Sequence, residues 1–172
     1  MTTDTNTNAR VAPLTVSRVF KAPVALVWQV HTDPAHLAKW LSPDNPAGFH
    51  SKLDFRAGGT HLYGTTNPDG SVMWGKQTFR EIVPMQRVVH VQSFTDQDGN
   101  ITAHPMAPTW PREMLTTTTY EDLGDNTTRL SVTWVPLSAT EVEEATFDGA
   151  RAGMRGGWDH QFGQIEAYLA TL

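Results

Sequence analysis

The stretch FDGARAGMRGGWDHQFGQIEAYL, residues 147–169, carries the longest periodic pattern in the sequence. Its large apolar side chains recur at spacings of three, four and seven residues, which places them on one face of an α-helix; they are Phe147, Met154, Trp158, Phe162, Ile165 and Leu169. Just upstream, Ser138 with Glu141 and Thr140 with Glu143 offer two alternative capping boxes. The pattern predicts a long C-terminal helix with one apolar face.

Between residues 53 and 135 the period of the apolar residues changes to two, which is typical of strands with one buried face. Sequences rich in Gly, Asp, Asn or Pro mark the turns between these strands. The predicted strands cover residues 14–20, 53–56, a run starting at 62, and 72–83, 87–94, 114–121 and 128–135. Successive hairpins predict a curved antiparallel sheet of six or seven strands, with the C-terminal helix across one face.

Two short helices are predicted directly after the first strand. Pro23 and Pro34 each suit a first helical position, and Asp33 is a good capping residue for the second helix. This second helix would turn three apolar residues inward, namely Leu37, Trp40 and Leu41. The predicted fold class is therefore α+β.

The chain has 172 residues, a usual length for one domain. Residues 1–12 are rich in Thr, Asn and Asp, so they bury too little apolar surface to offset the entropy of ordering. We predict a disordered N-terminal tail over residues 1–12 and a single domain over residues 13–172.

Charge and composition argue against several classes of partner. The net charge is -5 and no stretch concentrates Lys and Arg, which argues against nucleic-acid binding. No apolar run has the length of a membrane span, and the N-terminus lacks the order of a signal peptide. Without cysteine the chain has no disulfide and no thiolate metal site. A cytoplasmic location is expected.

Motifs for metal, cofactor or covalent chemistry are missing from the sequence. The seven histidines form neither His-x-His nor His-Glu-x-x-His, so no metal site is predicted. There is no Gly-x-Ser-x-Gly, no cysteine nucleophile and no glycine-rich phosphate loop that opens a helix. We predict no cofactor and no catalytic residue set.

A series of short motifs follows one another in order after residue 14. They are Arg18-Val19-Phe20 with Ala22-Pro23, Val27-Trp28, Thr32-Asp33-Pro34, Trp40 with Pro43, Asp54-Phe55-Arg56 with Gly58-Gly59, Gly75 through Phe79, Glu81 to Pro84, Pro105, Pro108, Trp110-Pro111, Tyr120-Glu121, Thr128-Arg129-Leu130, Gly153-Met154 and Gly157-Trp158. Their order and spacing resemble the SRPBCC (START/Bet v1-like) superfamily. Within it, the chain is similar to the proteins related to the activator of the heat-shock chaperone ATPase.

The resemblance implies a helix-grip fold with a cavity for apolar or aromatic small molecules. It implies no shared catalytic residues, because relatives include ligand-binding domains, co-chaperones and polyketide cyclases. A fold alone therefore does not select among these functions.

A cavity is expected because the space between a curved sheet and a single helix is hard to fill completely with side chains. Aromatic residues are the main candidates for lining the cavity, because ligand sites are mostly apolar. The alternative for each is ordinary core packing. The candidate ligand-binding residues, which include two polar groups that would orient the ligand, are Trp74, His90, Trp110, Trp134, Arg151, Met154, Trp158 and Phe162.

The two polar candidates each have a structural alternative. His90 alternates with Val88 and Gln92 on one strand face, where it is either a cavity group or an ordinary half-buried residue. Arg151 lies on the apolar face of the C-terminal helix. It either extends its guanidinium to water or a carboxylate such as Asp54, or it pairs with a ligand acid at the cavity mouth.

The leading hypothesis is a small-molecule-binding domain with a hydrophobic ligand. One alternative is a polyketide cyclase-like or hydratase-like enzyme with a cavity histidine as acid or base; another is a chaperone-partner domain that works through its surface. Five glycines lie on one arc of the last helix. One hypothesis is that a second subunit packs closely on this arc; the alternative is that the arc is a solvated helix face.

Overall fold

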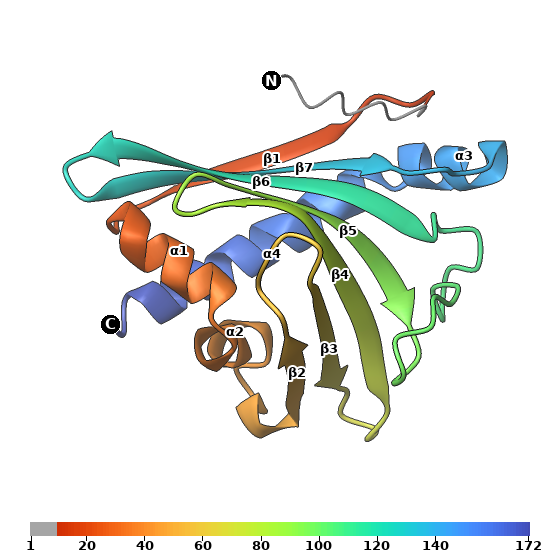
Figure 1. Ribbon diagram of the computed structural model, residues 1–172, viewed down its shortest axis with the longest axis horizontal. Helices are drawn as coiled ribbons and strands as arrows, with labels where there is room; N and C mark the ends of the chain where they lie inside the picture. Colours follow the sequence, from red (N-terminus) through yellow and green to blue (C-terminus); the bar gives the residue numbers. More distant parts are fainter. Residues whose placement is uncertain (1–9) are drawn as a thin grey trace.

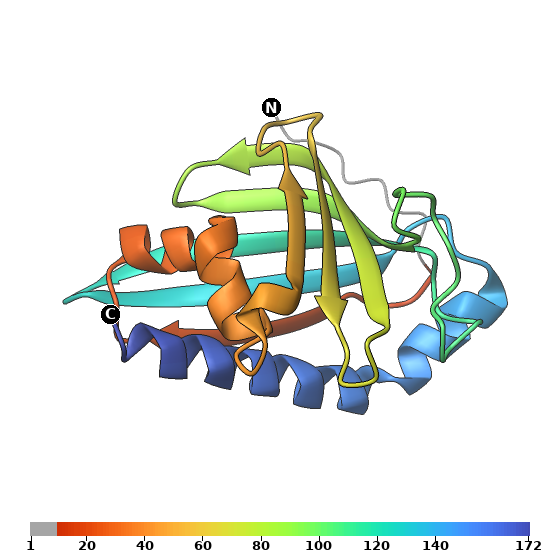
Figure 2. The same ribbon diagram turned by 90° about the horizontal axis from the view of Figure 1, so that it is seen from below.

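Seven antiparallel strands form one curved sheet in the computed structural model, which describes residues 10–172. The order across the sheet is β1-β7-β6-β5-β4-β3-β2 (Figure 1). The strands are β1 (Leu14–Phe20), β2 (Phe49–Leu53), β3 (Thr60–Thr66), β4 (Val72–Val83), β5 (Arg87–Thr95), β6 (Glu113–Gly124) and β7 (Thr127–Pro136). Because α4 (Arg151–Leu169) runs along the inner side of this sheet, the predicted α+β helix-grip fold is confirmed (Figure 2).

The short helices after β1 lie at one end of the inner side (Figure 2). They are α1 (Val24–Thr32) and α2 (Pro34–Leu41), followed by the 3-10 helix η1 (Pro46–Gly48). The Asp33 side chain accepts a hydrogen bond from the N–H of Ala35, 2.9 Å away, and caps α2 as predicted. Leu37 and Trp40 of α2 are buried, which places this helix against the core.

The core lies between the inner face of the sheet and the helices. Alternate residues of β1 and β7 meet the inner side of α4 there, as period-two strands require. Phe20, Phe147 and Phe162 are all fully buried, and the rings of Phe20 and Phe162 meet edge to face at 6.0 Å.

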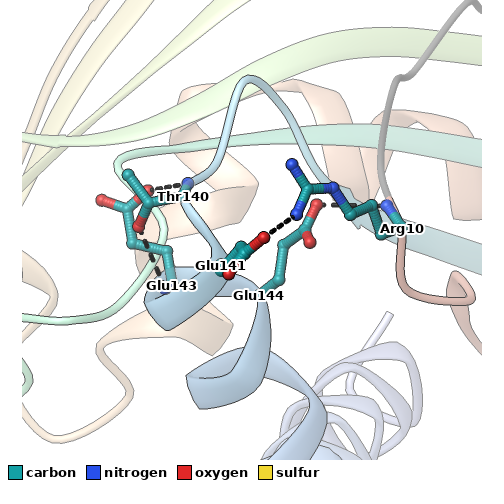
Figure 3. A network of polar contacts seen from close by, with 5 residues as sticks. All are labelled: Arg10, Thr140, Glu141, Glu143 and Glu144. Atoms are coloured by element: carbon teal, nitrogen blue, oxygen red, sulfur yellow. Dashed lines mark hydrogen bonds and ion pairs between the residues drawn. The ribbon is translucent and has the colours of Figure 1, made fainter.

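The predicted long C-terminal helix is in fact two helices, α3 (Glu141–Gly149) and α4, separated at Ala150. Of the two alternative capping boxes, the one between Thr140 and Glu143 forms: Thr140 Oγ1 accepts from the Glu143 N–H at 3.2 Å, and the Glu143 carboxylate accepts from the Thr140 N–H at 2.9 Å (Figure 3). The apolar periodicity runs through the break, which is why the sequence shows one helix.

Residues 10–12 of the predicted disordered tail lie within the described chain, whereas residues 1–9 lie outside the described residues. The N–H of Arg10 donates to the Glu144 carboxylate at 3.1 Å, and its guanidinium pairs with Glu141 (Figure 3). The first turn of α3 therefore accepts hydrogen bonds from the start of the described chain.

The strand predicted over residues 53–56 ends earlier, because β2 covers Phe49–Leu53 and residues 54–59 form a turn. Arg56 Nε lies 2.9 Å from a carboxylate oxygen of Asp54, so these two residues form an exposed ion pair. A Cβ at Gly59 would lie 2.1 Å from the carbonyl oxygen of Asp54, so the turn requires glycine there. The Asp54 and Arg56 pair is thus part of a turn and not of a strand.

The glycines predicted on one arc of the last helix lie in α3 (Gly149) and α4, and most of them face open space within the described chain. A Cβ built at Gly149, Gly153, Gly156 or Gly157 meets no described atom within 4 Å, and one at Gly163 meets only the end of the Arg18 side chain at 4.0 Å. No backbone of residues 10–172 packs closely on this arc. None of the helices of the described chain is long and apolar enough to cross a membrane.

Candidate functional site

A pocket of about 540 Å³ opens between the inner face of the sheet and helices α2 and α4. Its volume falls in the range of small-molecule sites, roughly 300–1,000 Å³. Strands β3 to β7, helices α1, α2 and α4, and the loop between β5 and β6 all contribute. The lining residues are His31, Leu37, Trp40, Leu41, His61, Tyr63, Thr65, Gln77, His90, Gln92, Phe94, His104, Ala107, Trp110, Pro111, Met114, Thr116, Thr118, Trp134, Trp158 and Gln161.

Four tryptophans provide the largest apolar surfaces of the pocket, and each comes from a different element. Trp134 of β7 and Trp158 of α4 meet edge to face with ring centroids 5.3 Å apart. The indole N–H of Trp40 donates to the carbonyl oxygen of Val30 at 2.9 Å, which fixes this ring on α2. Trp110, from the loop before β6, rests near the ring of Phe147. These rings form broad apolar walls suited to an aromatic body.

An adjoining cavity of about 40 Å³ shares three histidines with the pocket, His31, His61 and His90. Nδ1 of His31 lies 2.6 Å from the hydroxyl of Tyr120. Nε2 of His61 lies 2.8 Å from Oγ of Ser51. The polar side of the site is therefore held by hydrogen bonds between α1, β2, β3 and β6.

Burial keeps these histidines uncharged at neutral pH. It lowers the pKa of His31 from 6.5 to about 4. Burial, together with repulsion from His31 and His61, lowers the pKa of His90 to about 3. Burial also lowers the pKa of His61, against the opposing effect of its hydrogen bond to Gln77. The pKa of the Tyr120 hydroxyl is raised by burial, so this group stays protonated.

Strand pairing places His90, Thr116 and Trp134 in one row across the sheet. His90 of β5 is directly opposite Thr116 of β6, and Thr116 is directly opposite Trp134 of β7. Nδ1 of His90, Oγ1 of Thr116 and Nε1 of Trp134 are buried, and none has a hydrogen-bond partner within the described chain. Buried polar atoms are normally paired, so three adjacent unpaired atoms in residues that line the pocket are unusual.

The structure brings four of the eight sequence-predicted site residues together in the pocket, namely His90, Trp110, Trp134 and Trp158. The other four lie elsewhere. Trp74 is on the opposite face of β4, where its ring packs on that of His50 at 5.4 Å. Met154 packs against the hydrophobic core, and Phe162 is fully buried within it.

Arg151 does not reach the pocket. Its guanidinium lies over the ring of Phe147 at 5.1 Å and donates to Asp148 at 2.7 Å. It also donates to the backbone carbonyl oxygens of Ala12 and Pro13. Of the two alternatives for Arg151, the structure shows the pairing with a carboxylate, but the carboxylate is Asp148 and not Asp54. The hydrogen bonds to Ala12 and Pro13 also join the chain before β1 to the break between α3 and α4.

Several pocket residues were not predicted from the sequence. The hydroxyl of Tyr63 accepts a hydrogen bond from Gln92 at 2.8 Å, and Gln77 pairs with Gln92 across β4 and β5. The sequence feature that could have identified them is a polar residue two positions from another candidate on a predicted strand, as Gln92 is from His90. The sequence did not indicate which face of each strand is the inner one.

Comparisons with known proteins agree with this geometry. A family model described as "Activator of Hsp90 ATPase homolog 1-like protein" matches residues 21–170. Protein Ms6760 from Mycobacterium smegmatis has a similar structure, with a TM-score of 0.69, 25% identity, and coverage of 91% of this chain and 90% of that one. A protein from Arthrobacter aurescens has a TM-score of 0.73, 25% identity, and coverage of 93% and 87%.

A third similar structure is DynU16, a protein in the dynemicin biosynthetic locus. The match has a TM-score of 0.66 and 19% identity and covers 92% of this chain but 47% of DynU16. At this identity the likeness concerns the fold alone. Among curated proteins, none matches the chain.

Proposed function

Because the chain belongs to the Activator of Hsp90 ATPase homolog 1-like family, as its sequence motifs indicated, we propose that it binds an apolar or aromatic small molecule in the pocket between α4, α2 and the sheet. The observation that supports this most is a pocket of about 540 Å³ walled by four tryptophans. Sites for small ligands combine apolar and aromatic walls with a few fixed polar groups.

A function at the pocket accounts for more of the structure than a function at the surface. The family description concerns a chaperone ATPase, and a partner of that kind would dock on exposed apolar surface. Here the large exposed apolar residues come from several elements: strands β1 and β6, the turn after β4, the loop between β5 and β6, helix α3 and the C-terminus. Scattered exposed apolar residues are normal for any protein.

Native mass spectrometry of the purified protein tests the proposal by showing whether a small molecule co-purifies with it. Isothermal titration calorimetry with naphthalene then measures binding of a plain aromatic body. Ala107→Trp places an indole inside the pocket, so we expect at least a tenfold loss of affinity, while Ala152→Trp on the exposed side of α4 serves as the matched control. Equal naphthalene affinity in both variants, or no binding to the unaltered protein, contradicts the proposal.

A second candidate function is acid–base catalysis on a bound carbonyl compound, as in a polyketide cyclase or a hydratase. It is favoured by the 2.6 Å contact between His31 and Tyr120 beside His61 and His90. Neutral histidine can accept a proton, but the lowered pKa values make His31 and His90 weak bases. This is why binding without turnover is the leading proposal.

The enzyme alternative predicts that the protein accelerates exchange of the α-protons of 2-tetralone in D₂O, followed by NMR. His31→Gln should then remove the acceleration, whereas His160→Gln on the exposed side of α4 should keep it. Exchange at the rate of buffer alone excludes this alternative and leaves the binding proposal intact.

A further inference from the structure

The row formed by His90, Thr116 and Trp134 carries information about the ligand that the aromatic walls do not. All three residues line the pocket, and each has a buried polar atom without a partner in the described chain. His90 is 7% exposed and Thr116 is 3% exposed. An unpartnered buried polar group destabilises a protein, so a row of three suggests that a bound molecule, reached by small side-chain rotations, supplies the partners.

The chemistry of each atom restricts what that partner is. An indole N–H only donates, so the partner of Trp134 has to be an acceptor. A threonine hydroxyl donates and accepts, and a neutral imidazole offers one donor and one acceptor nitrogen. A carbonyl or hydroxyl oxygen satisfies all of these requirements.

The spacing of the row favours more than one ligand oxygen. Neighbouring strands are roughly 4.8 Å apart, so the backbones of His90 on β5 and Trp134 on β7 are separated by roughly 10 Å. Polar atoms at two separated positions on the ligand match this backbone spacing better than a single oxygen. A rigid fused-ring or extended aromatic system provides such a separation.

The lining also restricts the charge of the ligand. None of the described residues that line the pocket is Asp, Glu, Lys or Arg. A carboxylate or an ammonium group would lose its hydration there without gaining a counter-charge, which is strongly unfavourable. Arg151, the nearest candidate for an anion anchor in the sequence, is bound to Asp148 outside the pocket.

We infer that the pocket selects an uncharged aromatic molecule with hydroxyl or carbonyl oxygens at two separated positions, held by Thr116 and by His90 or Trp134 on either side of it. This inference rests on the proposed function and specifies its ligand class. The same site would discriminate against the corresponding hydrocarbon and against the corresponding acid.

Calorimetry at pH 7 with three matched probes tests the inference: 2,6-dihydroxynaphthalene, naphthalene and 2,6-naphthalenedicarboxylate. We expect the dihydroxy probe to bind on the order of tenfold more tightly than naphthalene, because each hydrogen bond to the row adds affinity. We expect the dicarboxylate to bind at least tenfold more weakly than the dihydroxy probe.

Variants show whether the row causes this preference. Thr116→Val removes one hydroxyl with little change of shape and should reduce the ratio of dihydroxynaphthalene to naphthalene affinity by roughly fivefold. Trp134→Phe removes the indole N–H together with one ring of the pocket wall, and since both neutral probes lose the ring contact, the ratio should again fall by roughly fivefold. Thr116→Ser keeps the hydroxyl and should keep the ratio. Thr117→Val makes the same change on the opposite face of β6 and should leave the ratio as it is.

The outcomes separate this inference from the proposed function. Equal affinity of the unaltered protein for the two neutral probes, or a ratio that neither Thr116→Val nor Trp134→Phe changes, overturns the role of the row and leaves the pocket as a plain apolar site. Tighter binding of the dicarboxylate overturns the assignment of an uncharged ligand. If none of the three probes binds and no molecule co-purifies, the proposed function falls together with the inference.

Discussion

The hydroxyl of Tyr120 on β6 lies 2.6 Å from Nδ1 of His31 on α1. A second pair of the same kind joins α2 to α4, where Nδ1 of His36 lies 2.8 Å from the hydroxyl of Tyr168. Each short helix is thus tied to a larger element by one histidine and one tyrosine. The first pair is more deeply buried, because Tyr120 is 6% exposed whereas Tyr168 is half-buried.

Removal of the Tyr120 hydroxyl should destabilise the protein more than removal of the Tyr168 hydroxyl. Tyr120→Phe removes the partner of the half-buried His31 imidazole at the buried Tyr120 ring, so we expect the free energy of unfolding to fall by about 1–3 kcal/mol. Tyr168→Phe leaves a nitrogen that water can reach, and we expect a loss of about 0.5–1 kcal/mol. Urea unfolding of both variants measures the difference, and equal losses would show that burial does not set the strength of the Tyr120 contact.

Stability should decrease as the pH falls from about 6.5 toward 4. The folded-state pKa values of His31 and His90 are about 4 and about 3, below the ordinary value of 6.5. In this range the unfolded chain binds more protons than the folded one, so acid favours unfolding by up to about 1.4 kcal/mol per pH unit for each histidine. Urea unfolding at pH 7, 6 and 5 measures the slope.

Two variants test whether the histidines cause this dependence of the free energy of unfolding on pH. His90→Gln should make the free energy of unfolding less steep in pH, because one of the three histidines with a lowered pKa no longer titrates. His160→Gln on the exposed side of α4 is the control. A slope that His90→Gln leaves unaltered would mean that His90 is not held neutral by burial.

Two buried threonines should respond in opposite ways to the same substitution. Oγ1 of Thr116 has no partner in the described chain, so Thr116→Val should raise the free energy of unfolding of the ligand-free protein by about 1 kcal/mol. Oγ1 of Thr128 donates to the carbonyl oxygen of Ala22 at 2.8 Å, so Thr128→Val should lower it by about 1–2 kcal/mol. A loss of stability in Thr116→Val would show that its hydroxyl is already satisfied.

Alanine at Gly153 or Gly156 should stabilise the protein by up to about 1 kcal/mol each, since glycine is a poor helix former and both positions face open space. Gly59→Ala should destabilise it, because its Cβ would collide with the backbone of Asp54. Thermal unfolding measures both effects, and size-exclusion chromatography reports the oligomeric state. A less stable Gly153→Ala protein of smaller oligomeric size would support close packing of α4 against a second copy.

Local patterns in the sequence were sufficient for most of the fold. The predicted limits of β1 and β4 are those observed, since alternation and the flanking prolines define both ends. The hairpin at Asp125 and Asn126 also forms as predicted, with both residues at positive φ. By contrast, the break at Ala150 was missed because the apolar spacing from Phe147 to Phe162 continues across it.

The pocket was harder to predict because its residues meet through strand register. Trp134 and Trp158 were recognised by their size and their positions on apolar faces. Thr116 stands in a run of four threonines, and only its pairing with His90 and Trp134 distinguishes it from Thr117. Register between distant strands depends on the assembled sheet, so no local pattern could assign this role.

The uncharged lining of the pocket has a consequence for the kinetics of association. Electrostatic steering accelerates the capture of ligands by proteins whose clefts carry charges of one sign, and salt weakens that acceleration. In the described residues that line this pocket there is no acidic or basic side chain to act at a distance. Because neither this lining nor an uncharged ligand carries a charge, such a molecule should enter at a rate set by ordinary diffusion and by the width of the opening, and this rate should be nearly the same in dilute buffer and in concentrated salt.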